Sequence, residues 1–317
     1  MTVDPFQSNN FQLFKAAAGP VILELLENKN KDIEEIMRNP DRRLFIYQKG
    51  KGEVEIDYLQ SDMQALQMLQ VVASENNQSV KTTSPRLKGV IPGYKYRFQG
   101  FLPDVVKSPS WNIRIPATAL YTLSDYVESG ILTEKQKDKL IELIQIGRNI
   151  LVVGSTRSGK TTFLNALLEE SSKLNVRHGI IEDTPELVCK APNTFCLLSN
   201  QYANAEELLA DTLRFGPRRI IIGEARTGQV VGTMLRASNT GHEGILCSIH
   251  ASSCLDGLYR IEELLEEDGA TPSPRSIARA IHTVVFIEVA PDASWRKVKE
   301  IVEVKGYQNG NYQLTAI

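Results

Sequence analysis

The segment that most restricts the fold of this chain is Gly154–Thr161, whose letters GSTRSGKT fit the pattern G-x-x-x-x-G-K-[ST]. An apolar run of the strand type, Ile150–Val153, precedes it, and a helical pattern follows it. The glycines let successive backbone N–H groups turn toward a phosphate, and the start of the helix adds the positive end of its dipole. This order of strand, loop and helix predicts a phosphate-binding loop in an α/β domain.

The residues of this loop have separate expected roles. Lys160 is expected to reach the β- and γ-phosphates of ATP, and the Thr161 hydroxyl is expected to ligate Mg²⁺. Arg157 is unusual at a position where small residues are the norm, and two interpretations stay open, a phosphate contact or a solvated side chain. The positions expected to bind the nucleotide are Gly154, Ser155, Thr156, Arg157, Ser158, Gly159, Lys160, Thr161 and Thr162.

Acidic residues follow two further apolar runs. The run Arg219–Glu224, RIIIGE, has the form of a Walker B segment, whose carboxylate can polarise water against the γ-phosphate or hold Mg²⁺ through water. The letters IEDTPEL at residues 181–187 place Glu182 and its neighbours at another strand end, where like charges repel unless a cation lies nearby. A solvated turn interrupted by Pro185 is the open alternative there. Glu224 is therefore the first candidate for catalysis.

The histidines and cysteines carry weaker signals. His242 and His250 flank a predicted strand at residues 245–249, but a lone histidine is more often structural than catalytic, so the spacing assigns neither a role. The cysteines form two pairs spaced seven apart, which matches no CxxC zinc or redox motif. Free thiols, buried or half-buried, are expected at Cys189, Cys196, Cys247 and Cys254.

The chain changes character after its first third. Proline punctuation predicts an interdomain linker at residues 103–118, between an N-terminal α/β domain at 1–102 and a larger domain at 119–317. In the larger domain, short apolar strands alternate with amphipathic helices, which favours a mostly parallel sheet with helices on both faces.

Local patterns in the first domain are more mixed. Apolar spacing predicts helices over Val21–Leu26 and Ile33–Met37, and a turn at residues 50–52 predicts a hairpin. Ser61 and Gln64 form a capping box before a helix. Residues 76–93 are expected to be loop or weak strand, residues 94–102 a strand, and in the larger domain Thr133 is expected to cap a helix through Ile146.

Composition limits the partners and the compartment. A chain of 317 residues with 42% apolar content can bury one large core or two modest ones. Lysine and arginine number 36 against 38 acids, so the chain lacks the overall positive field of an obligate nucleic-acid binder, although a local basic patch stays open. No signal peptide is recognisable and no apolar run approaches the roughly 18 residues of a membrane span, so a cytoplasmic protein is expected.

Four segments together carry a resemblance to a known family. The phosphate loop, IEDTPEL, LRFGPRRIIIGEAR and TGHEGILCSIHA occur in the order typical of secretion or traffic ATPases. The chain resembles the hexameric ATPases of type IV secretion systems, and most closely the TrbB-like conjugal-transfer ATPases. The resemblance covers most of the chain, because NPDRRLFIYQ, RFQGFLP, WNIRIP, YTLSDYVESGI and GYQNGNYQLT are also similar to that family.

The resemblance implies a fold and roles for single residues. It implies a RecA-like C-terminal domain joined to a smaller N-terminal α/β domain, with six copies in a ring. Lys160 and Thr161 match the Walker A pair, and Glu224 matches the catalytic Walker B glutamate. The other matches are Glu182 and Glu186 in the Asp box, His250 in the His box, and Arg97 and Arg114 as the arginines by which the N-terminal domain approaches the phosphates.

The resemblance also implies a cellular role. It implies an ATP- and Mg²⁺-dependent motor, with Thr161, Glu182 and Glu224 near the metal, that docks peripherally on inner-membrane secretion or conjugation proteins. Ser155 and Arg157 stand where glycine is common in the family, which leaves the nucleotide affinity open.

The alternatives are a nucleic-acid translocase or helicase with the same core, and a scaffold that binds ATP without turnover. The two arginines are expected to act on their own chain's nucleotide, with action across a subunit interface as the competing arrangement.

Overall fold

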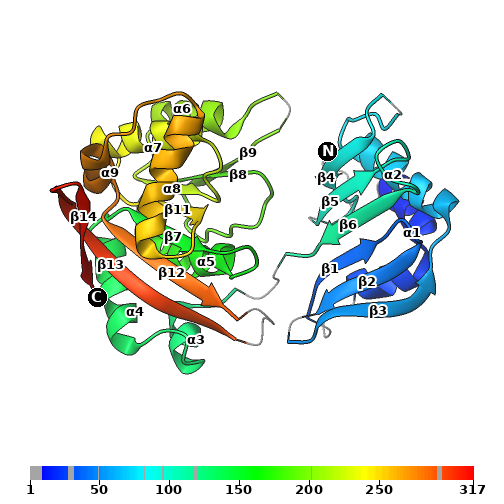
Figure 1. Ribbon diagram of the computed structural model, residues 1–317, viewed down its shortest axis with the longest axis horizontal. Coiled ribbons are helices and arrows are strands. Elements are labelled where there is room, and N and C mark those ends of the chain that lie inside the picture. Colours follow the sequence, from blue (N-terminus) through cyan, green and yellow to red (C-terminus); the bar gives the residue numbers. More distant parts are fainter. Residues whose placement is uncertain are drawn as a thin grey trace. The chain divides into compact units, whose positions relative to one another are not determined.

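The computed structural model of the chain describes residues 9–27, 32–48, 50–81, 83–94, 96–116, 120–200, 202–290 and 295–317. The chain divides into two compact units, Met1–Thr118 together with Pro291–Ser294, and Ala119–Ala290 together with Trp295–Ile317. Within the described ranges, no helix has both the length and the apolar character that a bilayer crossing requires. The two units are described separately below (Figure 1).

The N-terminal unit is an antiparallel sheet with two helices. Its six strands lie in the order β3-β2-β1-β6-β5-β4. The strands are β1 (Ile33–Arg38), β2 (Arg43–Gln48), β3 (Gly52–Leu59), β4 (Arg86–Val90), β5 (Arg97–Phe101) and β6 (Ser110–Arg114), and the helices are α1 (Asn9–Glu27) and α2 (Asp62–Glu75). Both helices bury apolar residues against one face of this sheet, where Phe14, Leu69 and Ile113 share one core.

Several local predictions for this unit are confirmed. β2 and β3 form the expected hairpin, and the capping box of Ser61 and Gln64 starts α2. The helix expected at Val21–Leu26 lies within α1, and the strand expected at 94–102 contains β5. The region 76–93, expected to be loop or weak strand, contains the short strand β4.

Two expectations for this unit are wrong. Ile33–Met37 is a strand, β1, because pairing with β2 on one side and β6 on the other overrides an apolar spacing that also fits a helix. The segment expected as a linker contains β6, which lies between β1 and β5 in the middle of the sheet. Pro109 and Pro116 lie just outside this strand, because a proline has no N–H to give to the ladder.

The C-terminal unit is built on an eight-stranded sheet in the order β14-β13-β12-β7-β11-β10-β8-β9. The strands from β12 to β9 are parallel, and β13 and β14 add an antiparallel edge. The strands are β7 (Ile150–Gly154), β8 (His178–Glu182), β9 (Thr194–Leu198), β10 (Arg219–Ile222), β11 (Ile245–His250), β12 (Thr283–Val289), β13 (Arg296–Gln308) and β14 (Asn311–Ala316).

Helices cover both faces of this sheet, as expected. Along β7, Leu151 and Val153 face one core, whereas Ile150 and Val152 face the other. One face packs against α6 (Ala205–Arg214), α7 (Gly228–Asn239), α8 (Cys254–Glu267) and α9 (Pro274–Ala280), and the other against α3 (Leu123–Glu128), α4 (Glu134–Gln145) and α5 (Lys160–Ser172) (Figure 1). Burial on both faces explains why the parallel strands read as continuous apolar runs. The expected capping box at Thr133 starts α4, and Ile146 is its C-cap.

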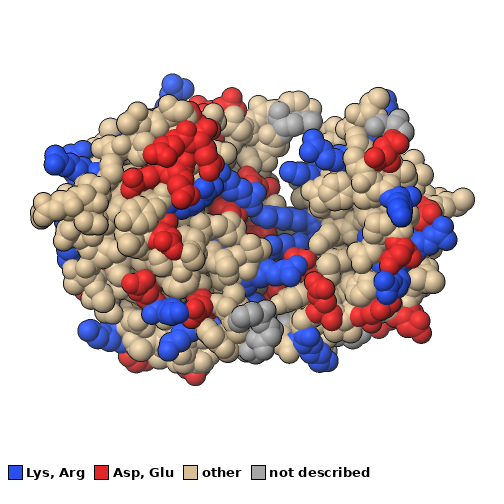
Figure 2. Space-filling model, viewed as in Figure 1, with Lys and Arg blue, Asp and Glu red and all other residues tan. Residues whose placement is uncertain are grey.

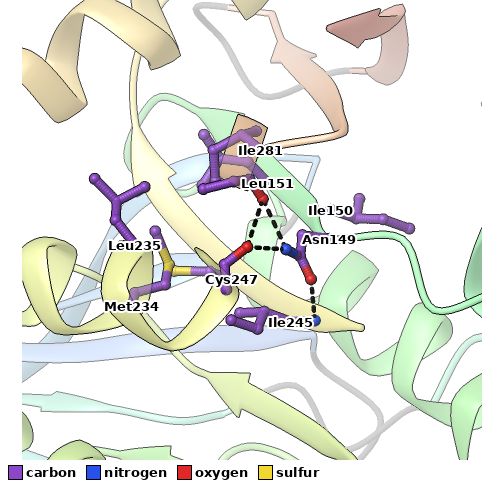
Figure 3. A pocket seen from close by; sticks show the side chains of 10 residues that line it. Asn149, Ile150, Leu151, Met234, Leu235, Ile245, Cys247 and Ile281 are labelled. Atoms are coloured by element: carbon purple, nitrogen blue, oxygen red, sulfur yellow. Dashed lines mark hydrogen bonds between the residues drawn. The ribbon is translucent and has the colours of Figure 1, made fainter. Parts of the chain in front are cut away.

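A buried asparagine holds the amino ends of the central strands. The Asn149 amide donates to Ser238 Oγ (2.6 Å) and to the Ala280 carbonyl (2.7 Å), and its oxygen accepts from the Ile245 N–H (2.8 Å) (Figure 3). Beside it lies a small pocket with apolar walls that include Met234. None of the predicted site residues lines this pocket, so we assign it to packing.

Candidate active site

The phosphate loop has the backbone that its glycines predict. A Cβ at position 154 would lie 2.5 Å from Ser158 Oγ and 2.6 Å from the Ile287 carbonyl oxygen, so this position accepts glycine alone. Gly159, the N-cap of α5, has φ 96°, in the left-handed region where a side chain is strained. The strand, the loop and the helix occur in the predicted order.

The start of α5 fits an anionic ligand. The first N–H groups of a helix have no partner inside it, and no side chain caps them at Gly159. Ser158 Oγ is buried and has no hydrogen-bond partner among the described residues. Thr161 and Thr162 lie half-buried in the first turn, and Ser155 and Thr156 are exposed at the loop tip. A loop of this shape offers N–H and O–H donors that bound phosphates would satisfy.

The Arg157 residue is not fully solvated. It is half-buried and has φ 62°, in the left-handed region that is uncommon for residues other than glycine. Its carbonyl accepts a hydrogen bond from Arg296 Nη2 (3.3 Å), at the start of β13. Sequence reasoning missed Arg296, because it lies 139 positions farther along the chain and carries no local motif.

Lys160 contacts its own loop and a histidine. Its Nζ donates to the carbonyls of Gly154 (3.0 Å) and Ser155 (2.8 Å), and it lies 3.0 Å from His250 Nδ1. An ammonium group is a donor alone, so Nδ1 accepts and the ring proton is on Nε2. His250 Nε2 lies 2.8 Å from Glu224 Oε1. The structure therefore brings together Lys160, His250 and Glu224, three of the predicted site residues.

Glu224 follows β10 and has a partner on each carboxylate oxygen. Oε1 accepts from His250, and Oε2 accepts from Arg226 Nε (2.9 Å) and Nη2 (2.6 Å). Burial alone would raise the pKa of this carboxyl, but the hydrogen bonds from His250 and Arg226 outweigh burial and lower the pKa to about 2. Glu224 is therefore ionised at neutral pH.

Glu182 and Glu186 lie in a turn that is tied to the helix of the phosphate loop. Glu182 ends β8 and is buried, and its Oε2 accepts from the backbone N–H groups of Glu186 and Leu187, each at 3.0 Å. Asn165 of α5 donates to the Glu186 carbonyl (2.9 Å) and accepts from the Val188 N–H (2.9 Å). The Glu182 carboxylate thus braces the turn. In the same turn, Asp183 contacts Arg226, which is a partner of Glu224; sequence reasoning did not single out Asp183.

Contacts continue from Lys160 along the carboxyl ends of the parallel strands from β7 to β9. Asp183 Oδ2 accepts from Arg226 Nη1 (2.7 Å), and Asp183 Oδ1 accepts from Ser199 Oγ (2.5 Å), just after β9. We call this series the carboxyl-edge chain. Its members, in the order of the strands that carry them from β9 to β7, are Ser199, Asp183, Arg226, Glu224, His250 and Lys160. It lies at the carboxyl ends of parallel strands, where open α/β sheets bind their ligands.

The remaining candidates lie elsewhere. Arg97 and Arg114 belong to the N-terminal unit, where they are directly opposite each other on β5 and β6. Their neighbours Phe98 and Ile113 face the core, so both arginines lie on the face opposite to the helices. His242 lies just before β11, at the amino end of that strand.

The cysteines are free, as expected, but they differ in exposure. Cys247 and Cys254 are buried, Cys189 is half-buried, and Cys196 is exposed, which contradicts the expected burial at that one position. Cys196 lies on β9, an edge strand whose alternate residues face solvent.

The described residues offer no ready protein cage for a metal. Among the described residues, no group of three or more histidine, cysteine or acidic side chains is arranged to hold a metal ion. Mg²⁺ is usually bound through one or two side chains together with substrate phosphates. The expected set of Thr161, Glu182 and Glu224 fits that mode rather than a closed site.

Comparison with known proteins decides the family. The family described as Type II/IV secretion system protein matches residues 30–305. The chain belongs to this family. It is 36% identical over 300 residues to the Probable conjugal transfer protein TrbB of Sinorhizobium fredii, covering 94% of this chain and 90% of that protein. It is 36% identical over 283 residues to the Conjugal transfer protein TrbB of Rhizobium radiobacter, covering 89% and 86%.

Two solved structures share the fold. The pilus retraction motor PilT with bound ADP matches with a TM-score of 0.62 at 18% identity, covering 93% of this chain and 81% of that one. The Legionella pneumophila ATPase DotB matches with a TM-score of 0.59 at 20% identity, covering 87% and 77%. The predicted fold class, a RecA-like P-loop domain with a smaller N-terminal α/β domain, is confirmed, and so is the resemblance to conjugal-transfer ATPases.

Proposed function

We propose that this secretion-family ATPase hydrolyses ATP in the presence of Mg²⁺, and that a ring of six copies uses the hydrolysis to drive conjugative transfer or type IV secretion. The observation that carries the proposal is the contact of Lys160 with His250 and of His250 with Glu224, at the carboxyl edge of a parallel sheet and beside a phosphate loop. Lys160, expected to bind phosphate, and the acid Glu224 are thus joined through His250.

Some of these residues bind the phosphates and the metal, and others act in the chemical step. The backbone of the phosphate loop binds the phosphates, and Lys160 exchanges its contacts with the loop carbonyls for phosphate oxygens. Bound Mg²⁺ neutralises charge on the phosphates, and the residues that would hold it are Thr161 directly, with Glu224 and Glu182 through water.

Glu224 acts on the attacking water. Its carboxylate is ionised and oriented by His250 and Arg226, so it accepts a hydrogen bond from that water and aims it. The hydrogen bonds from His250 and Arg226 lower its pKa, so it is a weaker base than an ordinary glutamate. Phosphoryl transfer passes through a loose transition state that needs an oriented nucleophile more than a strong base. Orientation is therefore the main role that we assign to Glu224.

We place Arg97 and Arg114 on the phosphates of the nucleotide held by their own chain. The two arginines are directly opposite each other on neighbouring strands, so both guanidinium groups can contact one anionic group. Arginine stabilises charge that develops in phosphoryl transfer. Because both arginines belong to a separate unit, their approach to the nucleotide would couple hydrolysis to a movement of that unit.

We place the ring in the cytoplasm, peripherally on inner-membrane secretion or conjugation proteins, in line with the conjugal-transfer names of its relatives. The alternative of a nucleic-acid translocase gains no support from the charge. The formal net charge is −2, and Asp and Glu side chains gather over α8 (Figure 2). The exposed acids in the last turns of α8 and at its C-cap are Glu263, Glu266, Glu267 and Asp268.

Steady-state turnover of the purified chain tests the proposal. We expect ATP hydrolysis that stops when EDTA removes Mg²⁺ and returns when Mg²⁺ is added back. Lys160→Ala should reduce turnover to background, because it removes the charge that reaches the β- and γ-phosphates. Lys173→Ala, at the other end of α5 and 57% exposed, is the matched control and should hydrolyse ATP like the wild type. Turnover near the wild-type rate in Lys160→Ala would contradict the assignment of the phosphate loop.

A further inference from the structure

Arg226 joins two acidic strand ends. It lies in the loop between β10 and α7, and its guanidinium donates to Glu224 Oε2 through Nε (2.9 Å) and Nη2 (2.6 Å). Its Nη1 donates to Asp183 Oδ2 (2.7 Å), just after the neighbouring strand β8. Two carboxylates so close to each other would repel without the positive charge between them.

The geometry requires an arginine at this position. A guanidinium presents its donors in a rigid planar fork, whereas a lysine ammonium is a single point charge on a flexible stem. Here one side of the fork contacts Glu224, and the remaining nitrogen contacts Asp183. The next residue, Thr227, is the N-cap of α7, so the start of that helix fixes the backbone position of Arg226.

The effect on Glu224 is positional. His250 contacts Oε1 and Arg226 contacts Oε2, so the carboxylate is fixed from both sides. Through Asp183 the same guanidinium reaches the turn whose other end Asn165 ties to α5, the helix of the phosphate loop. The Walker B carboxylate, the acidic turn and the phosphate-loop helix are thus connected through Arg226.

We propose that Arg226 is a positioning residue for ATP hydrolysis, which fixes the carboxylate of Glu224 and makes the loop after β10 and the turn after β8 move as one body. This inference rests on the proposed function. It does not place Arg226 on the nucleotide, so the effect of Arg226 is expected on the rate of the chemical step rather than on ATP binding.

A purely structural role makes a different prediction. The side chain of Arg226 is 49% exposed and that of Asp183 is 38% exposed. This pair contributes little to stability. Glu224 is only 19% exposed, but it keeps His250 as a partner when Arg226 is lost. Loss of Arg226 should therefore leave the thermal midpoint within about 4 °C of the wild type. A fall in turnover without a fall in stability identifies a positioning role.

The test compares Arg226→Ala, Arg226→Lys, Asp183→Asn and the double variant Arg226→Ala/Asp183→Asn. Arg226→Ala should lower kcat roughly 10- to 100-fold, the cost typical of losing a partner that orients a metal-ligating side chain. Its KM for ATP should stay within about threefold, since binding is not its role. Arg226→Lys keeps the charge but not the fork, so its kcat should lie between those of Arg226→Ala and the wild type.

The double variant shows whether Arg226 and Asp183 act together. Asp183→Asn should lower kcat less than Arg226→Ala does, and the double variant should be no slower than Arg226→Ala alone, because both changes break one connection. Arg214→Ala is the matched control, since Arg214 is 84% exposed and pairs with Asp211 on α6. It should keep the wild-type kcat and KM.

Three results would overturn the inference. They are a wild-type kcat in Arg226→Ala, a raised KM with unchanged kcat in that variant, and effects that multiply in the double variant. The proposed function is tested separately. If Lys160→Ala and Glu224→Gln abolish turnover while Arg226→Ala matches the wild type, this inference alone is wrong. If Lys160→Ala and Glu224→Gln hydrolyse ATP normally, the proposed function fails, and this inference fails with it.

Discussion

The amino ends and the carboxyl ends of the strands in the eight-stranded sheet, here called its amino edge and its carboxyl edge, use polar residues in opposite ways. At the amino edge, Asn149 is buried and neutral, and it bonds to three separate segments. At the carboxyl edge, charged groups bond to one another in the carboxyl-edge chain, and Arg226 and His250 are each about half exposed. The same strands therefore have one edge built for stability and another built for reversible contacts.

This difference teaches where function can be placed without loss of the fold. Bonds in which one charged partner is half exposed, as Arg226 and His250 are, contribute less to stability, so a ligand can replace them at smaller cost. Bonds inside the buried edge cannot be lost cheaply, because the groups left behind stay away from water. Substitutions at the carboxyl edge should change rates, and substitutions at the amino edge should change stability.

The largest expected effect comes from residues proposed to reach the carboxyl edge from the other unit. Arg97→Ala/Arg114→Ala should lower turnover roughly 10³- to 10⁵-fold, the usual contribution of arginine to phosphoryl transfer. Mixing this variant with Lys160→Ala decides which site the arginines serve. If they act on their own chain's nucleotide, no subunit has a complete site, so activity should stay near background once labelled subunits show that exchange has occurred. Recovered activity would move both arginines to the subunit interface.

A smaller effect is expected at the amino edge, in stability rather than rate. Asn149→Ala leaves the Ile245 N–H without its side-chain partner, and the Ala280 carbonyl keeps only its hydrogen bond from Ser238 Oγ. The free energy of unfolding of the C-terminal unit should fall by about 1–3 kcal/mol, measured by denaturant titration. Asn311→Ala, on the exposed end of β14, is the control and should cost less than about 0.5 kcal/mol. A stable Asn149→Ala variant with lowered kcat would reverse the assignment of the two edges.

The part of the fold that could be predicted is the part with local signals. The phosphate loop, the buried parallel strands and the capping boxes each depend on a few adjacent residues, and all occur as expected. β1 could not be predicted correctly, because its apolar spacing fits a helix and its strand partners come from distant segments. β13 also escaped prediction, since its many charged residues hide the strand pattern.

In the site, too, residues with a local motif could be predicted and contacts that depend on strand order could not. Lys160 and Glu224 have motifs of their own, whereas the contact between Arg226 and Asp183 depends on β8 and β10 being neighbours in the sheet. That order is not visible in the sequence. Arg296 reaches the phosphate loop from β13 for a similar reason. Local motifs identified Lys160 and Glu224, and the topology of the sheet decides which residues contact them.

The measurement that tests the account most directly separates ATP binding from hydrolysis in Glu224→Gln. This change keeps the shape of the side chain and removes its charge, so the variant should bind ATP within about threefold of the wild type while kcat falls roughly 10²- to 10⁴-fold. Glu263→Gln, on the exposed face of α8, should match the wild type in both measurements. A Glu224→Gln chain that hydrolyses ATP at the wild-type rate would contradict the claim that the carboxyl edge of this sheet is the catalytic site.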